Sequence, residues 1–315
     1  MAHETMDIDL VYLWVDGNDP EWLAKHNACV GKMEAKSATD CKGRYADNDE
    51  LKYSLRSIEK YAPWIRRIFI VTDNQTPAWL DTSDPKIRIV DHSEIMPAVS
   101  RPCFNATVIE HFICDIPGLA EHFLFANDDM FINRPVTPGT FFAEDGLPII
   151  RFNRRPFRKF TLWYKEKVQG KRLSNYIQII RNAAELVERK YGKYYGGKTH
   201  HNIDAYLKSD CQHVERMFRK EIEPTLTNHV RSANDIQRNL FAYVALAEKR
   251  AHLHYVGQRT SFRLHIQNES HYAKLERYNP MLFCMNDSQY AGDADREREK
   301  AWLERRFPEK SRFEK

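Results

Sequence analysis

The chain has 315 residues, of which 42% are hydrophobic and 29% are charged, and its formal net charge is +4. This length and composition are typical of a globular protein with a substantial core, arranged as one large domain or two smaller ones. The small net charge argues against nucleic acid as a partner. Apolar runs such as RIFIVT and LPII are far shorter than a membrane span.

The first residues and the cysteines indicate the compartment. The amino terminus, MAHETMDIDLVYLWVDG, has neither a basic stretch nor a long apolar stretch, so we expect no signal peptide. The six cysteines are scattered, without the spacing of a zinc site. Reduced thiols in a cytosolic protein are therefore expected, and a Cys29–Cys41 disulfide is the alternative.

Strands and helices alternate through the first half of the sequence. DNDELKYSLRSIEKYAP repeats apolar residues at helical spacing; Asp47 or Asn48 can cap this helix and Pro63 stops it. NATVIEHFICDIPGL predicts a shorter helix. The predicted strands are apolar runs that end in polar turns, namely IDLVYLWVDG, IRRIFIVTDN, KIRIVDHSEIM and EHFLFANDD. This order predicts an α/β fold whose mostly parallel central sheet is flanked by helices.

Residues 151–197 are predicted to form a basic, aromatic and helical insertion. Its first part, 151–173, carries nine Lys and Arg against one Glu, interleaved with five aromatic residues. This part is either a solvated face or a surface for an anionic partner, such as a phosphorylated glycan, a lipid headgroup or a nucleotide. LSNYIQIIRNAAELVERKYG, residues 173–192, predicts an amphipathic helix.

The last third of the chain predicts helices and one late strand. HHNIDAYLKSDCQHVERMFRKEI and SANDIQRNLFAYVALAEKRAHL are predicted helices, RYNPMLFCMNDSQY a strand with a polar turn, and ADREREKAWLERRF a charged terminal helix. We therefore divide the chain into the first part of an α/β core (1–150), the insertion (151–197) and a closing part (198–315) that completes the site.

Carboxylates follow all four predicted strands of the first half, at Asp16, Asp73, Asp91 and the pair Asp128–Asp129. Because ligands of such sheets bind beyond the carboxyl ends of the strands, we expect these side chains to converge, although four unrelated acidic turns would give the same pattern. Adjacent carboxylates suit a hard cation such as Mg²⁺ or Mn²⁺ that bridges substrate phosphates. Residue types alone therefore indicate an α/β protein with an acidic, metal-binding edge.

The quoted segments together resemble the Stealth family of sugar-phosphate phosphotransferases. The similarity lies in four regions: IDLVYLWVDGNDPEW, the run from RYADNDELK to LFANDDMFI, KTHHNIDAYLKS with LTNHVRSANDIQ, and NPMLFCMNDS with the terminal RRFPEKSRFE. Together these regions cover residues 8–135, 198–246 and 279–314. The resemblance implies a glycosyltransferase-A-like nucleotide-binding core. It also implies transfer of a sugar-1-phosphate from a UDP-sugar, similar to UDP-N-acetylglucosamine, to a hydroxyl of an acceptor glycan, with release of UMP.

The resemblance also implies catalytic roles for particular residues. These are Glu110 in VIEH, Asp129 in NDD, a histidine of THHN as general base, and Arg231 as the cation on the transferred phosphoryl group. The family motif is His-x-Pro. Asn202 stands in place of the proline, which favours His200 as the base and leaves His201 as the alternative.

Further residues are implied to hold the cofactor and the donor. Asp128 and Asp129, with Asn286 and Asp287, would hold Mg²⁺ or Mn²⁺. The residues expected to bind the substrate are Asp16, Gly17, Arg44, Asn48, Arg56, Asp73, Asn74, Gln75 and Asn105. For Arg56 the alternative is a salt bridge on its own helix.

The biology implied is synthesis of a bacterial capsule or lipooligosaccharide by a cytoplasmic enzyme. The acceptor would be a glycan or a lipid-linked saccharide. Residues 151–173, which the resemblance does not cover, would suit a lipid-linked acceptor by making peripheral contact with the inner membrane. Two alternatives remain from the sequence: a conventional metal-dependent glycosyltransferase that releases UDP, and a non-catalytic protein that binds glycans or nucleotides.

Overall fold

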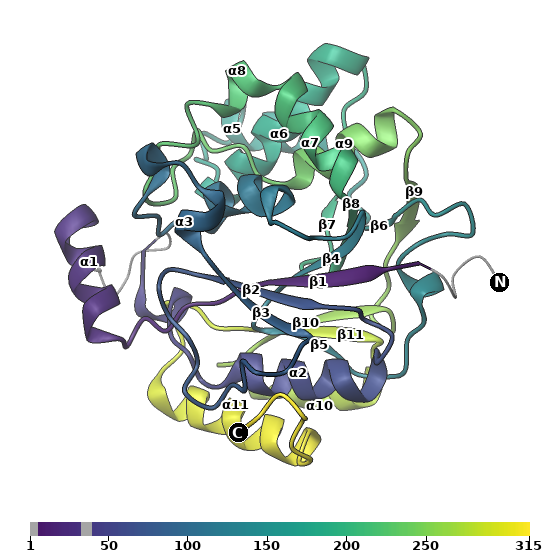
Figure 1. Ribbon diagram of the computed structural model, residues 1–315. Helices are drawn as coiled ribbons and strands as arrows, with labels where there is room; N and C mark the ends of the chain where they lie inside the picture. The colour runs from purple at the N-terminus through teal and green to yellow at the C-terminus, as the bar shows by residue number, and fades with distance from the viewer. Residues whose placement is uncertain (1–5, 33–39) are drawn as a thin grey trace.

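The computed structural model describes residues 6–32 and 40–315 (Figure 1). Its central sheet has five strands in the order β3-β2-β1-β4-β8. The first four are parallel: β1 (Ile8–Leu13), β2 (Ile68–Thr72), β3 (Ile87–Asp91) and β4 (His122–Asn127). The fifth, β8 (Asp204–Leu207), pairs antiparallel with β4. The predicted α/β fold with a mostly parallel sheet is confirmed.

The central sheet is buried on both faces, because successive side chains of a strand point to opposite sides. On β1, Val11 belongs to one hydrophobic core, whereas Leu10 and Tyr12 belong to the other. Helix α2 (Glu50–Tyr61) covers the second core. The first core is covered by α4 (Ala106–Ile109), α6 (Asn175–Tyr191), α7 (Lys208–Met217) and α9 (Asn239–Ala247). Helices α6, α7 and α9 lie above the sheet in Figure 1.

Two smaller sheets bring later segments against the central one. Strands β10 (Ser261–His265), β11 (Leu282–Asn286) and β5 (Met130–Ile132) form the first of these sheets, in that order, and β7 (Lys198–Thr199), β6 (Ile149–Asn153) and β9 (His252–Tyr255) form the second. Strand β11 runs antiparallel to β5, and the amide of Met285 donates to the carbonyl of Asp129 at 2.9 Å. The carboxy-terminal third therefore closes on the Asn-Asp-Asp turn.

Short or peripheral elements complete the described chain. The α-helices are α1 (Pro20–Val30), α3 (His92–Ile95), α5 (Arg158–Lys167), α8 (Arg219–Ile222), α10 (Glu269–Tyr278) and α11 (Asp293–Arg306). The 3₁₀ helices are η1 (Lys42–Arg44), η2 (Ala98–Ser100), η3 (Glu110–Asp115) and η4 (Pro138–Thr140). Helices α2, α10 and α11 lie below the central sheet in Figure 1.

Several predicted boundaries are wrong. HHNIDAYLKSDC begins as strand β8, and helix α7 starts only at Lys208, because residues 204–207 pair with the exposed edge of β4. SANDIQRNL begins with turns, and α9 starts only at Asn239. The residue that precedes α2 is Asp49 rather than Asp47 or Asn48, although the helix ends before Pro63 as predicted. Strands β9 and β10 and helices α1 and α10 were not predicted.

All six cysteines are free thiols, as expected, and Cys29 is the exposed one. In residues 6–32 and 40–315, none of the helices has the length and apolar character that crossing a bilayer requires.

Candidate active site

The turn after β4 holds a carboxylate that lacks a full set of partners. Asp129 Oδ2 lies 3.1 Å from Sγ of Cys284 on β11, whereas Oδ1 is buried without a hydrogen-bond partner. Burial raises the pKa of Asp129 to about 6. Because an unsatisfied buried carboxylate oxygen is unfavourable, Oδ1 is an atom that a cation or a substrate hydroxyl would satisfy.

Asp128 belongs to an acidic cluster, which we define as Asp47, Glu50, Asp128, Asp129, Asp287 and Glu299. Burial, followed by the nearby carboxyl groups of Glu50 and Asp129, raises the pKa of Asp128 well above its ordinary value. Burial and Glu50 do the same to Glu299, whose side chain is fully buried and whose Oε1 has no partner. Carboxyl groups that repel one another in this way are stabilised by protons or by a bound cation.

The residues expected to hold the metal fit a divalent cation only in part. Asp128 and Asp129 offer carboxylate oxygens, and Oδ1 of Asp129 is unpartnered. Asp287 is instead engaged by Arg296, whose Nε lies 2.8 Å from Oδ2. The Asn286 amide nitrogen donates to the carbonyl of Asp287 at 2.5 Å, which leaves the amide oxygen as its ligand atom. The fit therefore rests on the aspartate pair.

A histidine and a cysteine lie beside this aspartate. Within the described ranges, the one compact group of three or more metal-ligating side chains is Asp129, His201 and Cys284, whose ligand atoms lie within 4.8 Å of one another. Burial, then the positive charges of Arg263 and Lys198, lowers the pKa of His201 well below 6.5. Its imidazole is therefore neutral at physiological pH, which is the state a general base needs.

The neighbouring histidine points elsewhere. His200 is buried, its backbone amide donates to the carbonyl of Arg151, and its Nε2 lies 3.3 Å from Oδ1 of Asp204. Asn202, the residue in place of the motif's proline, is fully buried and donates to Ser261 Oγ at 3.3 Å. The structure thus brings His201 rather than His200 to Asp129, against the preference that the motif gave.

A buried ion network connects Glu110 to the antiparallel edge strand. The Arg238 guanidinium lies 2.6 Å from Asp204 Oδ2 and 3.3 Å from Glu110 Oε1, and its Cζ lies 4.5 Å from the ring centroid of Phe125. Burial raises the pKa of Glu110, and the positive charges of Arg238 and Arg231 oppose that rise. Sequence analysis missed Arg238, because it lies in a segment predicted to be a helix and no motif distinguishes it from a surface arginine.

Several positively charged side chains lie near His201. The structure gives the side chains of Arg231 and Arg263 no hydrogen bond or ion pair to any described residue. Burial, followed by Arg263 and Arg155, lowers the pKa of Lys198 to about 8. Burial, followed by Arg231, likewise lowers the pKa of Arg44 to about 10. Crowded positive charges of this kind favour an anionic ligand such as a phosphate or diphosphate.

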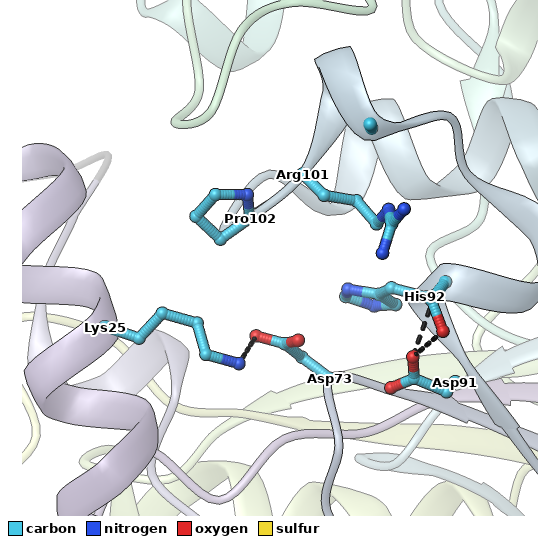
Figure 2. Close-up of a pocket in the computed structure, with 8 residues that line it drawn as sticks. Lys25, Asp73, Asp91, His92, Arg101 and Pro102 are labelled. Carbon is cyan, nitrogen blue, oxygen red and sulfur yellow. Dashed lines mark hydrogen bonds and ion pairs between the residues drawn. The ribbon is translucent and has the colours of Figure 1, made fainter.

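A cavity of about 360 Å³ opens at the carboxyl ends of β2 and β3 (Figure 2). Lys25 pairs with Asp73 at 2.8 Å on one side of it, and Asp91 caps α3 on the other. His92 Nδ1 and Arg101 Nε are buried here without hydrogen-bond partners. The cavity therefore offers polar groups of both charges to a ligand.

Four expected substrate residues build the loops beside this cavity. Gln75 exchanges hydrogen bonds with both backbone groups of Asp16, at 3.1 and 2.9 Å. Asn74 has a left-handed backbone (φ 56°) and donates its amide to Asp91 at 2.7 Å. A Cβ on Gly17 would lie 2.5 Å from the Cβ of Tyr45, so the close packing of this turn against Tyr45 requires a glycine.

The structure does not bring three other expected substrate residues to open positions in the site. Arg56 makes a two-pronged ion pair with Glu314, at 2.7 and 2.6 Å, so its partner lies at the chain's end rather than on its own helix. Asn105 is fully buried and donates to the carbonyl of Val230 and to Asp235, which holds the loop preceding Arg231. The Asn48 amide donates to Glu50 within the acidic cluster.

Two models of one protein family match the first half of the chain. The family model "Stealth protein CR1, conserved region 1" matches residues 6–34, and "Stealth protein CR2, conserved region 2" matches residues 44–150. The chain belongs to the Stealth family. The matched regions contain Glu110 and the Asn-Asp-Asp turn.

The similar proteins include exopolysaccharide and capsular polysaccharide phosphotransferases. This chain is 36% identical to one from Streptomyces coelicolor, over 98% of this chain and 52% of that protein. It is 36% identical to CpsY of Mycobacterium tuberculosis, over 98% of this chain and 58% of that protein, and 38% identical to cps1A of Actinobacillus pleuropneumoniae, over 73% and 62%. The chain thus spans about half the length of the curated relatives it matches.

Among solved structures, the chain is similar to the galactosyltransferase LgtC in complex with donor and acceptor sugar analogues. The TM-score is 0.43 at 12% identity, with 94% of each chain covered.

Proposed function

We propose that this Stealth-family chain transfers a sugar-1-phosphate from a UDP-sugar to a hydroxyl of an acceptor glycan, in the synthesis of an exopolysaccharide or capsule. The observation that carries the proposal is the position of His201 beside Asp129, close to the positive charges of Arg263, Lys198 and Arg231. The names of the curated relatives support the same class of reaction.

The reaction would proceed by attack on phosphorus. His201 accepts the proton of the acceptor hydroxyl, whose oxygen forms a bond to the β-phosphorus of the donor. The bond between that phosphorus and the bridging oxygen breaks, and UMP leaves with the bridging oxygen. Arg231 and Arg263 stabilise the charge on the phosphoryl oxygens, which is the main task of a protein in phosphoryl transfer. Glu110, with Oε2 unpartnered, orients the acceptor hydroxyl or the base.

A divalent cation belongs to this proposal. Asp128 and Asp129 would hold Mg²⁺ or Mn²⁺, with the amide oxygen of Asn286 as a further ligand atom. The ion would supply neutralisation of the diphosphate charge. The unpartnered Oδ1 of Asp129 and the repulsion within the acidic cluster support a cation here.

The cavity at the ends of β2 and β3 is proposed to receive the nucleoside. Its lining presents the unpartnered nitrogens of His92 and Arg101 and the paired Asp73, groups that can hydrogen-bond a base or a ribose. Asp16 lies on the adjoining loop. We propose N-acetylglucosamine as the transferred sugar and a free or lipid-linked glycan, such as that of a lipooligosaccharide, as the acceptor.

The released nucleotide tests the proposal. The protein is incubated with UDP-N-acetylglucosamine and related UDP-sugars, Mg²⁺ and candidate glycan acceptors, and the nucleotides are separated by ion-exchange chromatography. Acceptor-dependent UMP is the expected product. Acceptor-dependent UDP would identify a conventional glycosyltransferase, and binding of the donor without turnover for every acceptor would identify a binding protein. Asp129→Asn serves as the inactive control.

A further inference from the structure

Large apolar side chains that remain exposed gather on one short segment. Of the eight found in the described residues, five lie within the stretch 157–168. They are Phe157, Phe160, Trp163, Tyr164 and Val168, and Phe157 is 83% exposed. A concentrated apolar surface of this kind on a globular protein marks a place where another surface binds. We call these five residues the α5 apolar face.

Helix α5 turns this face away from the protein. Leu162, on the opposite side of the helix, is only 3% exposed and anchors it to the body. Arg158 and Glu166, one turn before and one turn after Leu162, are half-buried on the same side. In an ordinary surface helix the apolar stripe faces the core, whereas here the larger aromatic side chains point to solvent.

Ion pairs fix α5 to helix α6 in this orientation. Lys159 Nζ lies 2.6 Å from Glu188 Oε1, and Glu166 pairs with Arg181, which also contacts Glu185. Glu166 is the one acidic residue of the stretch 151–173, and Arg181 neutralises it. The apolar face is therefore presented by a helix that is held in place, and no anionic side chain of that stretch remains unpaired beside it.

Basic side chains border the apolar face on both sides. Arg154 and Arg155 precede it, and Lys165, Lys167 and Lys171 follow or flank it, all of them exposed. Lysine and arginine can extend their charged ends toward water while their methylene stems lie along an apolar surface. Aromatic residues on one face with flanking cations are the composition of helices that lie in a membrane interface.

We propose that the α5 apolar face docks this protein on an anionic phospholipid bilayer, with the aromatic side chains in the interface and the flanking lysines on lipid phosphates. Charge complementarity favours a bilayer over a neutral glycan, because each cation near an anionic surface adds to the attraction. The docking holds or fails independently of the phosphotransfer reaction.

The position of α5 connects the bilayer to the candidate active site. Arg155 and Arg158 lie close enough to Lys198 for their charges to act on it, and Lys198 lies 5.0 Å from the ring centroid of Tyr176 on α6. The ring centroid of Tyr176 in turn lies 6.5 Å from that of His201. A bilayer on the α5 apolar face would therefore lie beside Arg155, Arg158 and Lys198, where an acceptor carried by a lipid could reach His201.

Vesicle sedimentation tests the proposal on the whole chain. Equimolar phosphatidylglycerol and phosphatidylcholine vesicles should sediment the protein, and phosphatidylcholine alone should not. The double substitution Phe160→Ser with Trp163→Ser should weaken binding. Separately, the triple reversal of Lys165, Lys167 and Lys171 to Glu should weaken binding by at least about 100-fold, because each cation contributes roughly a fivefold factor and the new carboxylates are repelled by the anionic lipids. Raised salt should weaken binding as well.

Matched variants separate this face from the rest of the surface. Val99→Ser removes an exposed apolar residue elsewhere, and reversal of the exposed Lys220, Lys249 and Lys274 to Glu makes the same change in charge. Both should sediment like the wild type, and all variants should keep the wild-type melting temperature and the same activity on a soluble acceptor. Absence of wild-type binding, equal loss in the control variants, or a dimer in solution that the serine variants dissociate would each overturn the proposal.

Discussion

Replacing Arg238 by methionine would test whether the buried ion network supports the site. Its guanidinium and the Asp204 carboxylate lie 2.6 Å apart, and their side chains are only 4% and 5% exposed. Arg250 and Asp210 are separated by the same 2.6 Å, but the Arg250 side chain is 45% exposed. The two pairs therefore differ chiefly in burial, which makes Arg250→Met a matched control.

The expected effects on the free energy of unfolding follow from that difference. Removing one partner of a buried pair leaves an uncompensated charge and destabilises by about 3–5 kcal/mol. Here two carboxylates, Asp204 and Glu110, would lose the same partner. Breaking an exposed pair changes stability by about 0–1 kcal/mol. For a chain of this size, the melting temperature of Arg238→Met should fall by roughly 6–10 °C.

Urea unfolding followed by circular dichroism measures both variants against the wild type. A loss below about 1 kcal/mol in Arg238→Met, equal to that of Arg250→Met, would refute the reasoning, because it would mean that the buried carboxylates do not depend on this arginine. The same variant should lose activity at temperatures where it remains folded, since the pKa of Glu110 rises further without the neighbouring cation.

Three further predictions concern the reacting groups. Asp129→Asn should lower kcat by at least about 100-fold with little change in donor affinity, as steady-state kinetics and calorimetry would measure, and a wild-type kcat would remove Asp129 from the mechanism. EDTA should abolish wild-type turnover until Mg²⁺ or Mn²⁺ is restored. His201→Gln should abolish turnover while His200→Gln mainly lowers the melting temperature, and the reverse result would restore His200 as the base. Because the Lys198 charge is lost as pH rises through about 8, donor Kd should increase above that pH; Lys198→Arg should keep Kd constant there, and an identical rise in both would contradict the role of Lys198.

The strands and the acidic edge were predictable because they depend on local patterns. Buried strands of β-branched and aromatic residues, each followed by an Asp-containing turn, define β1 to β4 from the sequence alone. Their carboxyl ends then place Asp73, Asp91 and Asp128 at one edge of a sheet, whatever the rest of the chain does.

The remainder of the site depends on pairings between distant segments. Arg263 reaches the site only because β10 lies beside β11. Cys284 meets Asp129 only because β11 pairs with β5, and these two residues are 155 positions apart in the sequence. The choice between His200 and His201 depends on which of two adjacent residues turns toward Asp129. The short strand 204–207 was mistaken for helix because tertiary pairing with β4 decides its conformation.

The most direct test of attack on phosphorus uses a UDP-sugar whose anomeric oxygen, the one that joins the sugar to the β-phosphorus, is ¹⁸O. Mass spectrometry and ³¹P NMR then locate the label after transfer. The account predicts the label in the phosphodiester product and unlabelled UMP, because the bond between sugar and phosphate survives. Label in released UDP, with none in the glycan product, would show attack on the anomeric carbon and would contradict the account.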